Sequence, residues 1–356
     1  MSALSTGRIP RDDRPAARSP RRRSWRRRLL RATAGLVLVI CVLAAFGAGA
    51  QALVQHRNAS EHPAPGRLVD VGDHRLHLHA EGPRGTGPTV VLEAGMGTPS
   101  TSWAWVQQML TSDVRVVSYD RAGIGWSDDR DGPVDPAGQV RDLRTALDAA
   151  GEEGPYVLVG HSLGGLFART FAASYPEVTA GVVLVDPSHE DQYTDLPPEL
   201  QATVDSASTG ALLMKIASRV GITLLYNPAE ALTAGMPEEA AASYAAWSAS
   251  PRAASATAAE FAAFDAVADG ARDRDLGDLP VRILSGADTS DASGDPSQAA
   301  LLERQLSLHE QLTELSSDAR RTVVPGATHF TVLTDRGHAA TVAATVLDLV
   351  NEVRAG

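Results

Sequence analysis

The chain has 356 residues, of which 44% are apolar and 21% charged, so most of it is expected to fold around a buried core. This composition excludes bulk disorder and a protein with many membrane spans. Cys41 is the only cysteine, which excludes an intramolecular disulfide framework and a cysteine-based metal cluster.

The charge of the chain is distributed unevenly. Residues 1–31 contain 11 arginines against Asp12 and Asp13, a net charge of +9, whereas the whole chain carries −11. The remaining residues therefore carry −20. A body this acidic lacks the clustered positive charge that phosphate contacts need, so we expect no nucleic-acid partner.

The first predicted element is an apolar helix. Residues 32–50 form a run of 19 residues without a charge, which nearly spans a hydrocarbon core of roughly 30 Å, and residues 51–54 can extend it. The arginines before it predict that residues 1–31 stay in the cytoplasm as a tail. We therefore expect a membrane anchor over 32–54, followed by a body outside the cytoplasm.

A cleaved export signal is the alternative interpretation of the same segment. Residues 48–50 (Ala-Gly-Ala) match a small-residue cleavage site, so the body could be exported after cleavage near Ala50. Residues 26–30 (Arg-Arg-Arg-Leu-Leu) resemble a twin-arginine signal. The apolar run is long for a signal, which favours the anchor. Residues 55–66 are polar, contain two prolines and are predicted to be a linker.

From residue 67 to 356, short apolar runs alternate with helical patterns. This alternation predicts an α/β fold with a mostly parallel, doubly wound sheet, in which ligands bind beyond the carboxyl ends of the strands. Residues 188–278 interrupt the alternation, are rich in alanine and are expected to form an inserted helical cap. The strands are expected at residues 68–71, 75–79, 89–92, 114–119, 156–159, 182–185, 281–284 and 321–324.

The sequence Gly160-His161-Ser162-Leu163-Gly164 matches the pattern G-x-S-x-G directly between a predicted strand and a predicted helix. That context defines a nucleophile elbow, a strained turn that presents the serine hydroxyl above the sheet. Ser162 is therefore the candidate nucleophile. His329 follows the last predicted strand on the same edge of the sheet and is the candidate base that a serine needs.

The acid that would orient the histidine is ambiguous. Asp288 follows the penultimate strand and is the preferred candidate, with Asp186, after the strand that follows the elbow, as the alternative. Asp291 and Asp295 are further possibilities. The oxyanion donors are expected to be the backbone N–H groups of Leu163 and Met96.

The segment 120–127 (DRAGIGWS) forms a predicted tight turn at a strand end. It lacks the lysine of a phosphate-binding loop, so we interpret it as structural, with Asp120 and Arg121 bonding neighbouring loops. No cluster of His, Asp or Glu has metal-ligand spacing, and we expect neither a metal nor a cofactor.

Together, GHSLGG at the elbow, DRAGIGWS and PGATHF around His329 resemble the α/β-hydrolase superfamily over residues 67–354. The resemblance implies Ser162 as nucleophile, His329 as base, and Leu163 and Met96 as oxyanion donors. One departure is Ala94-Gly95, preceded by Glu93, where the family usually has His-Gly.

The expected function is a serine hydrolase that acts on carboxylic esters or related acyl compounds, small molecules, through a Ser-His-Asp triad and an acyl-enzyme. One alternative is an acyltransferase or a carbon–carbon bond hydrolase on the same fold. Another is a non-catalytic binding or sensor protein. A serine at the elbow argues against branches that use aspartate there, such as haloalkane dehalogenases and epoxide hydrolases.

Overall fold

The computed structural model describes residues 21–356 except 86, 273, 287 and 289–294. It divides into two compact units, residues 1–46 and 47–356. In the first unit the described residues belong to helix α1 (Arg21–Glu61), which continues into the second unit. Residues 55–61, predicted as part of the linker, are thus helical.

An eight-stranded sheet forms the centre of the second unit, in the order β1-β2-β4-β3-β5-β6-β7-β8. The pairs β1–β2 and β2–β4 are antiparallel, and every other pair is parallel. The predicted fold class is confirmed. The strands are β1 (Arg67–Asp70), β2 (Arg75–Glu81), β3 (Thr89–Glu93), β4 (Val116–Tyr119), β5 (Tyr156–His161), β6 (Thr179–Val185), β7 (Val281–Gly286) and β8 (Ala319–Val324).

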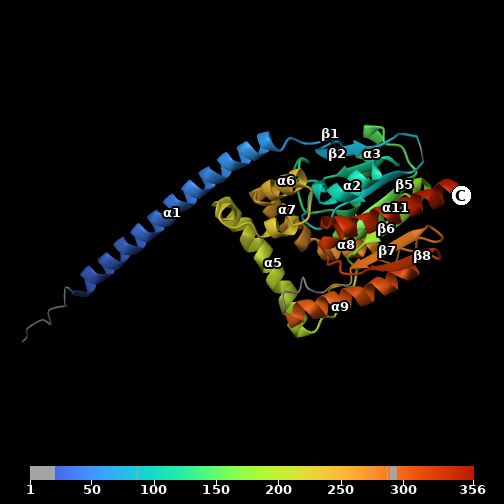
Figure 1. The fold of residues 1–356 in the computed structure, drawn as a ribbon. Helices are drawn as coiled ribbons and strands as arrows, with labels where there is room; N and C mark the ends of the chain where they lie inside the picture. The colour runs from blue at the N-terminus through green and yellow to red at the C-terminus, as the bar shows by residue number, and fades with distance from the viewer. Residues whose placement is uncertain (1–20, 86, 273, 287, 289–294) are drawn as a thin grey trace, which may run out of the picture. The chain divides into compact units, whose positions relative to one another are not determined.

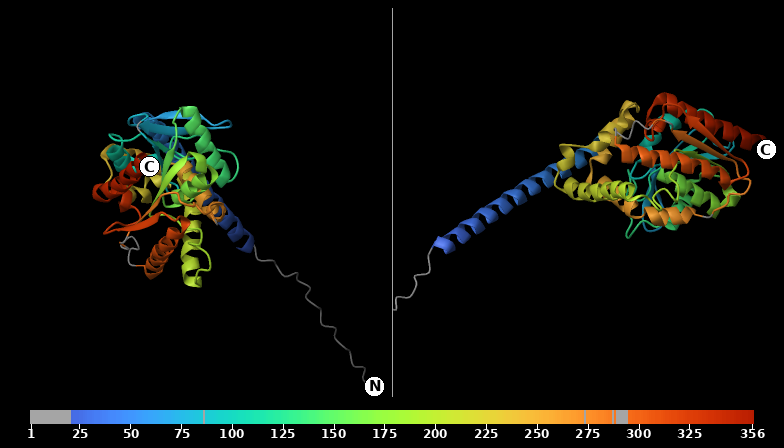
Figure 2. Two further views of the ribbon diagram at one scale, coloured as in Figure 1. Left: turned by 90° about the vertical axis from the view of Figure 1, so that its right-hand side faces the viewer. Right: turned by 90° about the horizontal axis from the view of Figure 1, so that it is seen from below.

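Helices cover both faces of the sheet (Figures 1 and 2). One face packs against α3 (Pro136–Ala150), α4 (Leu163–Ser174) and α8 (Phe264–Ala271). The other packs against α2 (Ala104–Leu110) and α11 (Arg336–Ala355), with the short α10 (Thr331–Thr334) beside them. Along β6, Val182 and Leu184 face one layer while Val183 and Val185 face the other. This two-sided burial explains the continuous apolar runs.

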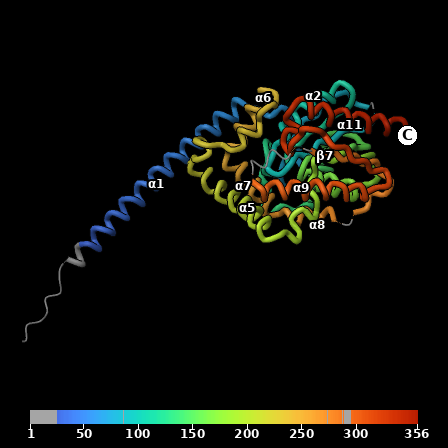
Figure 3. Tube along the Cα trace, turned by 60° about the horizontal axis from the view of Figure 1, so that its bottom comes forward, coloured from blue at the N-terminus to red at the C-terminus, as the bar shows by residue number. Residues whose placement is uncertain are grey.

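Between β6 and β7 the chain forms the predicted helical insertion. Its helices are α5 (Pro198–Arg219), α6 (Glu238–Ser248), α7 (Pro251–Ala262) and α8, with the 3-10 turns η3 (Ile222–Leu224) and η4 (Pro228–Thr233) between α5 and α6. Helices α5 and α7 lie side by side (Figure 3). Helix α8 packs against α4 and so belongs to the layer on the sheet. We call the segment from α5 to α7 the cap. Helix α9 (Pro296–Gln311) follows β7.

Candidate active site

The turn between β5 and α4 has the geometry of a nucleophile elbow. Ser162 has φ 54° and ψ −126°, a conformation that costs energy for a residue with a side chain. The flanking glycines permit it, because a Cβ atom at Gly160 would lie 2.4 Å from the carbonyl oxygen of Gly164. A Cβ atom at Gly164 would lie 2.3 Å from the carbonyl oxygen of Glu93. Small residues are therefore required for the strand and helix to approach this closely.

The loop after β8 brings His329 to this turn. Its Nε2 lies 3.0 Å from Ser162 Oγ, and its Nδ1 lies 2.5 Å from Asp186 Oδ2. Because an ionised carboxylate only accepts hydrogen bonds, Nδ1 carries the proton and Nε2 is left to accept from the serine hydroxyl. Ser162, His329 and Asp186 thus form one continuous hydrogen-bonded chain.

The carboxylate in this hydrogen-bonded chain is that of Asp186, the alternative candidate from the sequence, and not that of Asp288, the preferred candidate. Asp186 directly follows β6, which lies beside β5 in the sheet, and its φ is 41°. Its Oδ1 also accepts the backbone N–H of Gly286 at 2.8 Å. Burial raises the pKa of Asp186, but the hydrogen bond and the charge of His329 outweigh it and lower this pKa to about 2.

Of the other candidate acids, Asp288 lies near this group and lines a small cavity together with Asp186 and His329. Asp288 stands two residues beyond the end of β7, where its backbone N–H donates to the carbonyl of Ala327. Asp295 caps the N-terminus of α9, accepting from the N–H of Ser297. Asp291 lies outside the described residues. The buried strand β6 ends directly before Asp186 and places it next to the elbow, whereas Asp288 is exposed and stands one residue further from the end of β7.

The side chain of His161 contacts His329. Its Nε2 donates to the carbonyl of His329 at 2.9 Å, and the centroids of the two rings are 4.8 Å apart. Burial lowers the pKa of His161 to about 3, so this ring stays neutral and does not compete as a base.

The loop after β3 approaches the same serine. A Cβ atom at Gly95 would lie 3.0 Å from His161 Nδ1 and 3.3 Å from Ser162 Cβ, so the loop backbone packs closely against the elbow. Within the described residues, the N–H of Met96 has no hydrogen-bond acceptor, while that of Gly97 donates to Glu260. The N–H of Leu163 lies in the first turn of α4, where a helix offers no internal acceptor. Both N–H groups are available to a ligand at Ser162.

A buried network of charges holds this loop. The guanidinium of Arg121 donates to the carbonyls of Ala94 and Gly95 at 2.6 and 2.8 Å. It also forms ion pairs of 2.7 Å with Glu93 and with Glu260 of cap helix α7. Burial raises the pKa of Glu93, whose carboxylate also accepts from the hydroxyl of Tyr119. The network is almost fully buried and joins the cap to the loop that carries Met96.

The role expected for Asp120 and Arg121 as bonding partners of neighbouring loops agrees with these contacts. Asp120 accepts from the N–H of Ser100 at 2.7 Å and binds the buried ring of His77 at 2.9 Å. Sequence reasoning missed Glu260, which lies in an alanine-rich helix 167 residues after Glu93. Its isolated charge among alanines was the one available signal.

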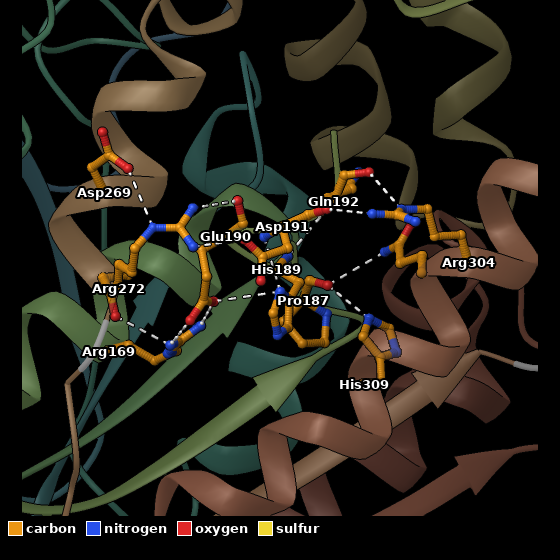
Figure 4. Close-up of polar contacts among 12 residues, drawn as sticks. Arg169, Pro187, His189, Glu190, Asp191, Gln192, Asp269, Arg272, Arg304 and His309 are labelled. Atoms are coloured by element: carbon orange, nitrogen blue, oxygen red, sulfur yellow. Dashed lines mark hydrogen bonds and ion pairs between the residues drawn. The ribbon is translucent and has the colours of Figure 1, made fainter. Parts of the chain in front are cut away.

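The segment that follows Asp186 is also held firmly (Figure 4). Arg169 pairs with Glu190, Arg272 pairs with Asp191 at 2.6 Å, and Arg304 donates to the carbonyls of Asp191 and Thr194. These contacts join α4, the end of α8 and α9 to one loop.

His309 of α9 anchors the residue next to the acid. Its Nε2 donates to the carbonyl of Pro187 at 2.7 Å (Figure 4). Its Nδ1 accepts from Ser285 Oγ at 3.0 Å. Burial lowers the pKa of His309, which favours the neutral ring that makes these two hydrogen bonds. The sequence analysis had not singled out His309, because its helical position gives no hint of the contact. Within the described ranges, no group of three or more His, Cys, Asp or Glu is arranged to hold a metal ion.

Comparison with known proteins identifies the family of the chain. Residues 90–344 match the model of the alpha/beta hydrolase family. The match covers well over half of the chain, and the chain belongs to this family.

Curated relatives match over shorter segments. "Probable transporter efuK" from Hormonema carpetanum is 35% identical over 136 residues, which are 36% of this chain and 20% of that protein. The matched part is at most half the length of the first such relatives. These relatives therefore share a segment of the chain rather than its whole organisation.

Solved structures agree on the fold. An esterase from Thermogutta terrifontis has a TM-score of 0.56 at 21% identity, covering 81% of this chain and 98% of its own. An epoxide hydrolase from Bacillus megaterium has a TM-score of 0.61 at 15% identity, covering 80% and 100%. Since different hydrolytic chemistries share this fold, the similarity alone does not select one of them.

Proposed function

We propose that the protein is a serine hydrolase acting on carboxylic esters or related acyl compounds, with Ser162 as nucleophile, His329 as base and Asp186 as acid. The observation that carries the proposal is the hydrogen-bonded chain from Ser162 Oγ through the ring of His329 to Asp186 Oδ2. A hydroxyl is a weak nucleophile, and an adjacent neutral imidazole oriented by a carboxylate is the arrangement that activates it.

In the proposed reaction, Ser162 Oγ attacks the acyl carbon while His329 Nε2 takes its proton. Asp186 stabilises the imidazolium through Nδ1, and the N–H groups of Met96 and Leu163 donate to the oxyanion. The imidazolium then gives its proton to the leaving alcohol, which departs and leaves an acyl-serine. Water, deprotonated by His329, attacks this ester; the acid is released and the proton returns to Ser162.

Labelling with a fluorophosphonate tests the nucleophile. The wild type is expected to be labelled and to hydrolyse a p-nitrophenyl ester, with a chain-length series reporting the preferred acyl size. Ser162→Ala should lose both labelling and nearly all turnover, with an unchanged melting temperature. The matched control is Ser174→Ala, at the exposed end of α4. Undiminished labelling of Ser162→Ala would refute the assignment.

Product analysis with an added alcohol distinguishes hydrolysis from acyl transfer. A hydrolase is expected to release the free acid as the main product even at high alcohol concentration. A dominant ester product would instead identify an acyltransferase that uses the same acyl-enzyme.

We also propose that α1 anchors the protein in the cell membrane with the hydrolase unit outside the cytoplasm. Helix α1 includes a segment, Trp25–Glu61, that by length and composition could cross a membrane. The arginines that precede its apolar part support the orientation. N-terminal sequencing of the mature protein tests this anchor: a soluble form beginning at Gln51 would establish cleavage after Ala50 instead.

A further inference from the structure

The cap carries exposed apolar side chains on α5 and the turn after it. Leu225 is 89% exposed, Tyr226 67% and Leu213 60%. We call the whole group the α5–η3 surface. Its members are Leu212, Leu213, Ile216, Ile222, Leu225 and Tyr226.

Exposed large apolar side chains are rare elsewhere in the described part of residues 47–356. They comprise Leu53 on α1 and three residues scattered over the body, Leu68, Val323 and Phe330. Single exposed apolar residues need no explanation, whereas six within fifteen residues mark an interaction surface.

The end of α1 within the same compact unit contacts residues next to this surface. A Cβ atom at Gly47 would lie 1.9 Å from the carbonyl oxygen of Val220, so the two backbones are in direct contact. One turn further along, Gln51 donates to the carbonyl of Ala249 at 2.9 Å, and its side chain also binds Thr223. The exposed side chain of Leu53 belongs to this stretch of α1.

The position of Gly47 in the sequence places this contact near the end of the apolar run that is proposed to span the membrane. Gly47 lies three residues before the end of the charge-free run 32–50, which is roughly 4.5 Å of helix. If the run spans a membrane, Val220 and its neighbours lie where the helix leaves the hydrocarbon core.

Charge on the C-terminal part of α5 fits the same environment, while the acidic residues of this helix, Glu199 and Asp205, lie nearer its start. Lys215, the only lysine in the chain, and Arg219 lie between the exposed leucines and η3. A helix that combines exposed Leu and Ile with basic residues is typical of one lying in a membrane interface, where anionic headgroups attract the basic groups.

We propose that the α5–η3 surface is embedded in the headgroup region of the lipid bilayer that α1 spans. The proposal rests on the membrane anchor proposed above. It makes the cap a second, interfacial contact with the membrane and places the hydrolase unit directly on the lipid surface.

Spin labels on the full-length chain in nanodiscs of phosphatidylcholine and phosphatidylglycerol test this proposal. In a Cys41→Ala background, single cysteines replace Leu213, Ile216 or Leu225, and Ala344→Cys on the exposed side of α11 is the matched control. Oxygen, which partitions into lipid, and a water-soluble nickel chelate then report the environment of each nitroxide. The cap labels are expected to show an oxygen-to-nickel ratio at least several times that of the control.

Each contrary outcome has a distinct meaning. Cap labels as accessible to nickel as the control, on a chain that resists alkaline extraction from membranes, would overturn the docking and leave the anchor intact. Protection of the cap labels from both reagents would show that protein, such as a second copy, covers the surface. A chain released by alkaline extraction would overturn both the anchor and the docking. Fluorophosphonate labelling of the same samples tests the catalytic proposal separately.

Discussion

At the carboxyl edge of the sheet, Glu93, Arg121 and Asp186 are nearly fully buried, and each makes several hydrogen bonds. In the cap, by contrast, α5 buries only Ser218 and α6 only Tyr244. The sheet edge is thus fixed by many directional contacts to buried strands. The cap helices bury few side chains and are held by polar contacts such as those of Glu260 and Arg252.

The two regions should therefore respond differently to substitution. Groups at the sheet edge have positions set by backbone geometry, so a change in one of them should act on the chemical step. The cap has a largely exposed surface, so most changes there should leave folding and chemistry intact. Two residues of α7 connect the regions: Glu260 contacts Arg121 and Gly97, and Arg252 contacts the segment after β4. The following predictions test the contrast from the largest effect to the smallest.

Removing the proposed acid should have the largest effect. Asp186→Asn is expected to lower kcat on the order of 10⁴-fold, because the histidine loses the partner that fixes its tautomer. Asp288→Asn, the matched control, should lower kcat less than tenfold. Steady-state kinetics with a p-nitrophenyl ester, combined with melting curves, measures both. A collapse of kcat in Asp288→Asn alone would identify Asp288 as the acid.

Truncating one leucine in each region should show how much packing contributes to stability in the sheet and in the cap. Leu184→Ala, in the buried strand β6, is expected to lower the free energy of unfolding by about 2–5 kcal/mol because it leaves a cavity. Leu213→Ala, on the exposed surface of α5, should change it by less than about 0.5 kcal/mol. Denaturant unfolding in detergent provides the comparison. Equal losses in the two variants would show that α5 is packed as tightly as the sheet.

Neutralising Glu260 should show that the cap helps to position the loop that carries Met96. Glu260→Gln weakens the ion pair with Arg121 and the hydrogen bond from Gly97, so the Met96 N–H loses its fixed position. We expect kcat to fall roughly 10- to 100-fold with KM changed less than threefold, since the donor acts mainly on the transition state. Glu239→Gln on exposed α6 is the control. A rise in KM at unchanged kcat would instead assign Glu260 to substrate binding.

The pH dependence of stability should report Asp186 directly. Its pKa of about 2 lies below the ordinary value of 3.8, so the charged form stabilises the fold above pH 4. This contribution, roughly 2 kcal/mol, is lost as the pH falls from about 4 through 2. The difference in unfolding free energy between wild type and Asp186→Asn should therefore narrow over that range. A constant difference would show that Asp186 titrates normally.

The local patterns of the sequence determined the alternation of strands and helices, the elbow at Ser162, the helical insertion and the apolar N-terminal helix. They did so because periodicity, glycine spacing and charge-free length act on neighbouring residues. The observed strand boundaries lie within three residues of the predicted ones; the largest difference is at β6, which begins at Thr179, three residues before its predicted start.

Tertiary structure alone decided which carboxylate meets His329. Asp186 and Asp288 both follow a strand end, and no local pattern distinguishes them. The choice depends on β6 lying beside β5 and on Asp186 directly following its buried strand, whereas Asp288 stands one residue further from the end of β7. Glu260 and His309 were likewise invisible, because their partners Arg121 and Pro187 lie more than a hundred residues away. Contacts across such distances depend on packing, and packing is a property of the whole fold.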